Sequence, residues 1–88
     1  MEKFNFKRLK KLSLAYNKIS DIKVLEKVKF KELEELYLNN NKISDIKVFE
    51  KVKFEDLEEL KLEGNKIDLT KNSLIISNLK SLLKTLSI

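Results

Sequence analysis

The 88-residue sequence lacks cysteine, histidine and proline, and it contains a single glycine, Gly64. Without cysteine the chain forms neither disulfides nor a thiolate metal site, and this composition is compatible with a reducing compartment. Because histidine is missing as well, the commonest general base, nucleophile and transition-metal ligand are all absent. We therefore expect no catalytic residue, no metal site and no cofactor.

Long apolar runs are also missing. No stretch of about 18 consecutive uncharged apolar residues occurs, so no membrane span is expected. The N-terminal residues MEKFNFKRLKK contain no apolar run of signal-peptide length. These features predict a cytoplasmic protein that does not bind membranes. With no proline and one glycine, a flexible linker is not expected either, and the length corresponds to one small domain or a piece of a larger protein.

The chain repeats itself with a period of 24 residues. Residues 17–38 and 41–62 differ at 4 of 22 aligned positions, which indicates recent duplication or deliberate consensus design. A fixed period of about 20 to 50 residues is typical of proteins built from stacked repeats. The apolar side chains of one unit do not offset the entropy lost on ordering it, so the units must pack against one another.

Each repeat carries leucines and an asparagine at the same spacing. The pattern L-x-x-L-x-L-x-x-N-x-I occurs three times, beginning at Leu9, Leu33 and Leu57. This pattern resembles the leucine-rich repeat family, and the I-x-x-I continuation of the first two copies is similar to the internalin-like subclass. The resemblance covers residues 4–69. It implies an α/β fold, a right-handed solenoid with a short parallel β-sheet on the concave face and short helices on the convex face. It also implies a non-catalytic protein–protein interaction module.

The residues of each unit independently predict the same elements. Alternation in the L-x-L segment sends Leu12 and Leu14 to the core and their neighbours to the opposite face of a short strand. Ser20 and Ser44 are expected to cap short helical segments, each with an aspartate in the first turn. Apolar residues at three-residue spacing should then face inward; these are Ile22, Leu25, Val28, Ile46, Phe49 and Val52.

Asn17, Asn41 and Asn65 follow the three predicted strands. Backbone groups lose their strand partners where the chain leaves the sheet, and a buried asparagine can both donate and accept hydrogen bonds. We therefore predict a stacked structural asparagine ladder that bonds the loops of adjacent turns, which is also the role that the resemblance implies. A ligand-contacting role is the alternative. Asn39 and Asn40 have a different phase and are expected to be exposed.

The partner-binding surface is expected on the outward strand positions, which form three columns across the sheet. The columns consist of Lys11, Glu35 and Glu59, of Ser13, Tyr37 and Lys61, and of Ala15, Asn39 and Glu63. Glu35 beside Glu59 brings like charges together, and a basic protein partner would relieve their repulsion. The alternative is that these glutamates only keep a small sheet soluble. Tyr37, and less strongly Tyr16, are the best aromatic anchors for an interface, although each is equally explained as an ordinary surface residue.

The last third of the chain departs from the repeat. Residues 83–88, LKTLSI, resemble residues 9–14, LKKLSL, and predict a final strand. Apolar residues between 75 and 86 also keep helical phase, which would suit a terminal capping helix. We expect a helix followed by a strand. The expected organisation is one domain, 1–88, made of an N-terminal flank (1–8), repeats (9–32, 33–56 and 57–82) and a final strand (83–88).

A final strand would leave Leu83, Leu86 and Ile88 at an open edge of the sheet. Open apolar edges favour pairing with another chain. Self-association through this edge, as a two-fold dimer or head to tail onto the first strand, is the second binding hypothesis, and a designed structural repeat fragment would behave in the same way.

The net charge of +5 raises the question of nucleic-acid binding. Lys23, Lys27 and Lys29, with their counterparts 24 residues later, form a basic patch on the predicted convex side. Acidic residues interrupt this patch, and no aromatic residues interleave it for base stacking. Nucleic acid is therefore not an expected partner, and weak binding of the convex lysines to an anionic surface remains an alternative.

Overall fold

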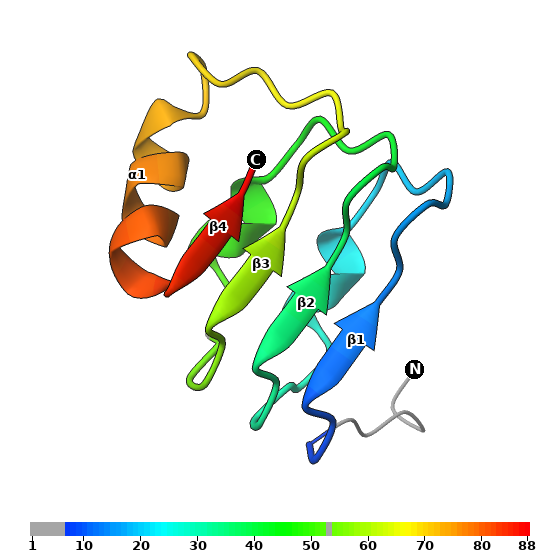
Figure 1. The fold of residues 1–88 in the computed structure, drawn as a ribbon, viewed down its shortest axis with the longest axis vertical. Coiled ribbons are helices and arrows are strands. Elements are labelled where there is room, and N and C mark those ends of the chain that lie inside the picture. Colours follow the sequence, from blue (N-terminus) through cyan, green and yellow to red (C-terminus); the bar gives the residue numbers. More distant parts are fainter. Residues whose placement is uncertain (1–6, 53) are drawn as a thin grey trace.

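The computed structural model describes residues 7–52 and 54–88 and contains a parallel sheet, two 3₁₀ helices and one α-helix (Figure 1). In chain order the elements are β1 (Lys11–Ser13), η1 (Lys23–Glu26), β2 (Glu35–Tyr37), η2 (Lys47–Glu50), β3 (Glu59–Lys61), α1 (Ser73–Leu82) and β4 (Thr85–Ser87). Of the expected N-terminal flank, 1–8, only residues 7 and 8 belong to the described part of the chain.

The four strands lie side by side in the order β1-β2-β3-β4, and every pair is parallel. The register aligns Leu12 with Leu36, Leu36 with Leu60 and Leu60 with Leu86. Successive strands begin 24, 24 and 26 residues apart. Parallel strands need a crossover connection, so each turn of the chain passes over one face of the sheet before it starts the next strand. The predicted solenoid is confirmed, with strands that begin one residue before the L-x-L segments.

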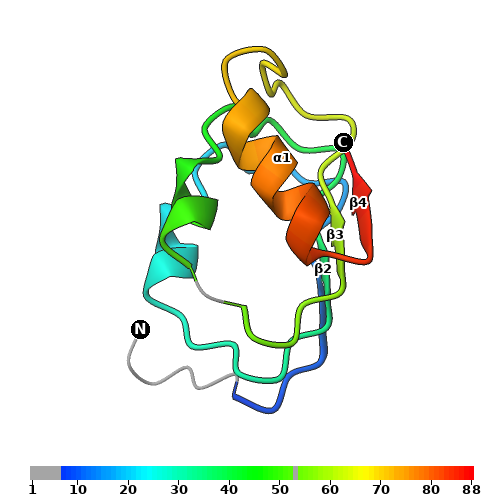
Figure 2. The same cartoon turned by 90° about the vertical axis from the view of Figure 1, so that its left-hand side faces the viewer.

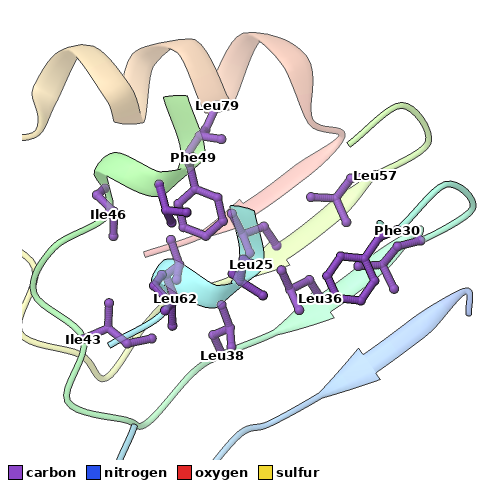
Figure 3. Packing of buried hydrophobic residues seen from close by; sticks show 14 of the residues in the cluster. Leu25, Phe30, Leu36, Leu38, Ile43, Ile46, Phe49, Leu57, Leu62 and Leu79 are labelled. Carbon is purple, nitrogen blue, oxygen red and sulfur yellow. The ribbon is translucent and has the colours of Figure 1, made fainter. Parts of the chain in front are cut away.

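Burial of the leucines follows their position in the stack. Leu36, Leu38 and Leu60 are fully buried because turns lie on both sides of them. Figure 3 shows Leu36 and Leu38 among the other side chains of the core. Leu12 is only half-buried, although it occupies the same place in the first turn as Leu36 does in the second. Leu86 at the other end of the sheet is also half-buried. The terminal turns therefore have less complete cores than the central ones.

The convex layer opposite the sheet contains η1 and η2, with α1 beside them (Figure 2). The inward residues at three-residue spacing match the three residues per turn of a 3₁₀ helix, and Leu25 and Phe49 are buried while Val28 and Val52 are half-buried. Phe30 and Phe54, which come after these helices in their turns of the chain, stack with ring centroids 6.1 Å apart.

The prediction that Ser20 and Ser44 cap these helices is wrong. Each helix begins three residues after its serine, at Lys23 or Lys47, and neither has a side-chain cap. The aspartates after the serines bond the first residue of each helix instead. Asp21 Oδ1 accepts a hydrogen bond from the Lys23 N–H at 2.9 Å, and Asp45 Oδ1 accepts one from the Lys47 N–H. A carboxylate bonding its own backbone two residues on is a common way to start a turn.

The C-terminal third forms both elements that the sequence analysis favoured, a helix and then a strand. Helix α1 buries Ile76 and Leu79 against the core and is followed directly by β4, which pairs with β3. Its outer surface leaves Leu74 and Leu82 largely exposed. Among the described residues, no helix has the length and hydrophobicity needed to cross a membrane.

Asn41 connects the second turn to the first, and Asn65 connects the third turn to the second. Asn41 Oδ1 accepts from the Ile19 N–H of the previous turn at 3.1 Å, while its Nδ2 donates to the Leu14 and Leu38 carbonyls, both at 3.0 Å. Asn65 repeats this arrangement one turn later, accepting from Ile43 and donating to Leu38 and Leu62. Asn17, in the first turn, is exposed and donates only to carbonyls of its own turn.

Three residues in the same phase of successive turns have left-handed backbone conformations. The φ angles are 59° at Tyr16, 61° at Asn40 and 74° at Gly64. A Cβ atom on Gly64 would lie 2.5 Å from Asn40 Nδ2, so a side chain here would displace the Asn40 amide in addition to straining the backbone.

Replacing Asn41 with alanine should strongly destabilise the fold. The substitution leaves the Ile19 N–H without its partner and removes one of the two side-chain donors to the Leu14 carbonyl, which should lower the free energy of unfolding by about 1 to 3 kcal/mol. Asn17→Ala is the matched control, because the same five residues follow an exposed asparagine there, and the loss should stay below about 1 kcal/mol. Urea unfolding measures both, and equal losses would contradict a role for the bonds between turns.

Candidate partner-binding surface

The outward positions of the sheet form a continuous surface, here called the concave face. The register places Lys11 beside Glu35 and Glu35 beside Glu59, and it places Ser13 beside Tyr37 and Tyr37 beside Lys61. Thr85 and Ser87 continue these two columns on β4. Lys11 and Ser13 on the edge strand are exposed, whereas the side chains on β2 and β3 are half-buried by their neighbours. Six of the predicted partner-binding residues therefore share one surface.

Tyr37 is at the centre of this surface and contacts four of its neighbours. Its hydroxyl lies 2.5 Å from Glu35 Oε1 and 3.1 Å from Glu59 Oε1. The Lys11 and Lys61 Nζ atoms lie 4.9 and 4.6 Å from the centroid of its ring, within the range of cation–π attraction. The arrangement follows from the strand register, because Glu35 is two residues before Tyr37 on the same face and Glu59 is the cross-strand neighbour of Glu35.

The Tyr37 hydroxyl reduces the repulsion expected between Glu35 and Glu59, because its hydrogen is attracted to both carboxylates. The hydrogen bond to Glu35, burial and the hydrogen bond to Glu59 all raise the pKa of the Tyr37 hydroxyl above its ordinary value. Ionised tyrosine would place a third negative charge between two carboxylates, which is why the neutral form is favoured.

The third column lies just beyond the strands, and here one expectation is wrong. Asn39 was expected to be exposed but is 8% exposed, and Asn40 is half-buried. Hydrogen bonds from the Tyr16 N–H to the Asn39 carbonyl and from the Asn40 N–H to the Glu63 carbonyl hold the three turns together past the ends of the strands. The central turn is therefore covered from both sides, and Asn39 Nδ2 donates to Asn40 Oδ1 at 3.0 Å.

Glu63, the last member of the third column, is half-buried. Its Oε1 atom is buried and lacks a hydrogen-bond partner among the described residues. Asn39 and Glu63 therefore offer less side-chain surface to a partner than the two columns that contain Tyr37.

The contacts of Lys11 and Lys61 with the Tyr37 ring were not predicted from the sequence. The predicted columns put Lys61 directly beside Tyr37 and Lys11 diagonally beside it, which would have been enough to infer both contacts. The exposed ion pair between Lys84 Nζ and Glu58 Oε2, at 3.2 Å, was missed because Lys84 belongs to the irregular last turn. Such exposed pairs contribute little to stability.

A family model described as leucine rich repeats (2 copies) matches residues 7–51 and, one repeat further along, residues 31–74. The two matches together cover more than half of the chain. The chain belongs to the leucine-rich repeat family. No curated protein and no solved structure gives a significant match to it.

The motif of the leucine-rich repeat can now be related to the structure. Its leucines and its isoleucine form the core, and its asparagine in the second and third copies joins adjacent turns. The residues between the leucines take part neither in the core nor in the bonds between turns, and they face outward on the sheet. Proteins of this family commonly bind other proteins, and solenoids do so through extended concave surfaces. The residues around Tyr37 are therefore the candidate site.

The convex side of the leucine-rich repeat carries charges of both signs. A groove of about 370 Å³ between the first two crossovers is lined by acidic and basic side chains, among them Asp21, Glu26, Lys47 and Lys51. The mixture agrees with the interrupted basic patch read from the sequence, of which Lys53 lies outside the described residues. Within the described part of the chain, no three potential metal-ligating side chains cluster together.

The opposite edges of the sheet are β1 and β4. On β4 and on either side of it in the chain, Leu83, Leu86 and Ile88 are half-buried, and they pack against the edge of the core. The neighbouring Leu82 is 77% exposed, so apolar surface continues from this edge onto the end of α1.

Tyr37 should ionise at unusually high pH. In Tyr16→Phe, Tyr37 is the only tyrosine, so tyrosinate absorbance during a pH titration reports on it alone. The midpoint should lie above about 10, the value for a free tyrosine, because two carboxylates oppose the charge. A midpoint at or below that value, in a sample whose circular dichroism is still that of the folded chain, would contradict the contacts around Tyr37.

The same group should make stability depend on pH in the alkaline range. Above pH of about 10 the unfolded chain releases the Tyr37 proton while the folded chain retains it, so the folded state binds more protons and the free energy of unfolding falls as pH rises. Tyr37→Phe removes this component. Its urea midpoint should therefore decline less than that of the unchanged protein across this range, and parallel declines would argue against it.

Proposed function

We propose that this leucine-rich repeat protein is a non-catalytic interaction module that binds a protein partner through the concave face. The observation that carries the proposal is the environment of Tyr37, a half-buried aromatic side chain in contact with two carboxylates and two lysines. Tyrosine is among the residues most enriched at the energetic centres of interfaces, where they lie within a ring of polar contacts.

Preorganisation supports this role for Tyr37. Binding usually requires side chains to lose rotamer freedom, which costs about 0.5 to 1.5 kcal/mol for each flexible side chain. The hydroxyl contacts with Glu35 and Glu59 already fix the ring, and the sheet register fixes the strands that carry it. A partner that packs on Tyr37 therefore meets a side chain with little freedom left to lose.

A basic side chain is the partner group that these contacts favour. The Tyr37 hydroxyl has a single hydrogen, whereas two ionised carboxylates together accept about eight hydrogen bonds. Most of the acceptor capacity of Glu35 and Glu59 is thus available to a partner. An arginine fits best, because its fork of N–H groups matches carboxylates and its flat face stacks on aromatic rings.

We also infer the finer assignment within the family. The strand spacing supports division of the chain into repeats 9–32, 33–56 and 57–82 followed by a final strand, and the I-x-x-I continuation supports the internalin-like subclass. Other proteins of this subclass should then also have short 3₁₀ helices in their crossovers, as this chain has in η1 and η2.

The concave-face proposal can be tested with peptides selected on the intact protein. Random peptides of about 12 residues, displayed on phage and selected for binding, should be enriched in arginine or lysine, and Tyr37→Ala or Glu59→Lys should weaken the best binders by about tenfold or more. Calorimetry or fluorescence anisotropy of the synthetic peptides gives the affinities.

Glu26→Lys is the matched control for Glu59→Lys, because it makes the same charge change on exposed helix η1 of the convex side. It should change the affinities by less than about threefold. Binders that are equally sensitive to both substitutions, or that are insensitive to Tyr37→Ala, would refute binding at the concave face.

Self-association through β4 is a second candidate function. The observation in its favour is that β4 is a sheet edge, that its central residue Leu86 is only half-buried, and that Leu82 shortly before it is exposed. The unpaired side of an edge strand is a template for another strand. If this edge pairs, light scattering should show a mass that rises with concentration, and Leu86→Lys should abolish the rise. A mass that stays that of the monomer at all concentrations would exclude this function.

A further inference from the structure

A row of lysines runs along the loops at the carboxyl ends of the strands. Lys18, Lys42 and Lys66 each follow a ladder asparagine, and all three are exposed. Hydrogen bonds from the Lys42 N–H to the Ile19 carbonyl, at 2.8 Å, and from the Lys66 N–H to the Ile43 carbonyl, at 2.9 Å, hold the loops in register. The three side chains therefore start from equivalent points of successive turns.

The ammonium groups of this row form no salt bridge within the part of the chain that the structure describes. The aspartates further along the same loops are oriented toward the backbone instead, since Asp21, Asp45 and Asp68 each accept a hydrogen bond from the backbone N–H two residues later in the chain. Like charges repeated at the spacing of adjacent turns, about 4.8 Å, produce a local positive potential.

Tyr16 is at one end of this row and is 77% exposed. Its φ of 59° is one that bulky residues rarely adopt, and the equivalent positions in the next two turns are Asn40 and Gly64, the residue types that tolerate it best. The Tyr16 side chain makes no hydrogen bond or ring contact with the described residues. Tyrosine here combines a strained backbone conformation with a largely exposed side chain, and strained, exposed residues of this kind occur preferentially at binding sites.

We propose that Tyr16, Lys18, Lys42 and Lys66 form a second binding surface, which takes an extended acidic peptide segment of a partner protein. Carboxylates of the segment lie along the lysine row, and an apolar side chain beside them packs on Tyr16. The row spans about 10 Å over two inter-turn steps, the length of three or four residues of extended chain. This surface is distinct from the concave face and does not depend on what binds there.

The distribution of aromatic residues favours a peptide over a single-stranded nucleic acid. Nucleic-acid grooves combine phosphate-binding lysines with several aromatic rings on which successive bases stack. Here one ring lies at the end of the row, and Asn40 and Gly64 occupy the positions where further rings would be needed. A peptide with one apolar side chain beside a line of carboxylates fits this arrangement of one ring and three lysines.

The proposal can be tested on the intact protein with a fluorescein-labelled peptide of six glutamates preceded by phenylalanine. At low salt, fluorescence anisotropy should show binding, and the triple variant Lys18→Glu, Lys42→Glu, Lys66→Glu should weaken it by about tenfold or more. The matched control is Lys23→Glu, Lys47→Glu, Lys51→Glu, three exposed lysines of the convex side, which changes the net charge equally and should weaken binding by less than about threefold.

Two results would overturn the proposal. Equal weakening in both triple variants would mean that only the overall charge attracts the peptide. Tighter binding of an oligothymidylate of the same charge, lost in the loop variant, would assign the surface to nucleic acid instead.

Tyr16→Asn separates a binding role from a structural one. Asparagine tolerates the left-handed conformation, so the melting temperature should rise by several degrees. Binding of the glutamate peptide should nevertheless weaken, by about three- to fivefold, because the apolar contact is lost. A more stable protein with unchanged peptide affinity would show that Tyr16 takes no part in binding.

Discussion

The structure depends on one constraint: each turn of the solenoid is covered only by the turns beside it. A turn by itself would expose the leucines of its strand and leave unpaired the backbone groups at which the chain leaves the sheet. Stacking solves both problems together, because a neighbouring turn covers Leu36 and also supplies the Leu14 carbonyl and the Ile19 N–H that Asn41 binds. Packing and hydrogen bonding therefore reinforce the same register, which is expected of a sequence that specifies one fold.

Because the core and the bonds between turns involve other residues, the side chains at the outward strand positions are not needed to hold the turns together. Inward residues are held to leucine and isoleucine by the core, and Asn41 and Asn65, in the loops that follow β2 and β3, are held to asparagine by the bonds between turns. The outward positions require only residues that are compatible with a β-strand, so polar, charged and aromatic side chains can occupy them. The cluster around Tyr37 shows how the sheet then organises such residues: strands from three different turns bring a phenol, two carboxylates and two ammonium groups into contact.

The same stacking places charges at regular intervals wherever the repeat contains one. Lysines in equivalent loop positions become a row, and glutamates in equivalent strand positions become neighbours. On the strands, the Tyr37 hydroxyl reduces the resulting repulsion from within the chain. On the loops, the lysines have no such partner among the described residues. This difference separates the two surfaces, since one is internally balanced around an aromatic ring and the other carries lysines that form no salt bridge in the described part of the chain.

The sequence by itself determined the 24-residue period, the parallel strands, the columns of outward residues and the helix and strand at the C-terminal end, because these follow from the spacing of residue types along the chain. Only the tertiary structure decided how each copy of a pattern is used. Asn17 and Asn41 precede the same five residues, K-I-S-D-I, yet one is exposed and the other is 7% exposed and joins two turns. Asn39 is buried for the same reason, and the contacts of the Tyr37 hydroxyl and ring also required the assembled sheet. Burial and partners are properties of the neighbouring turns, and identical local sequences meet different neighbours at the end of a stack and in its middle.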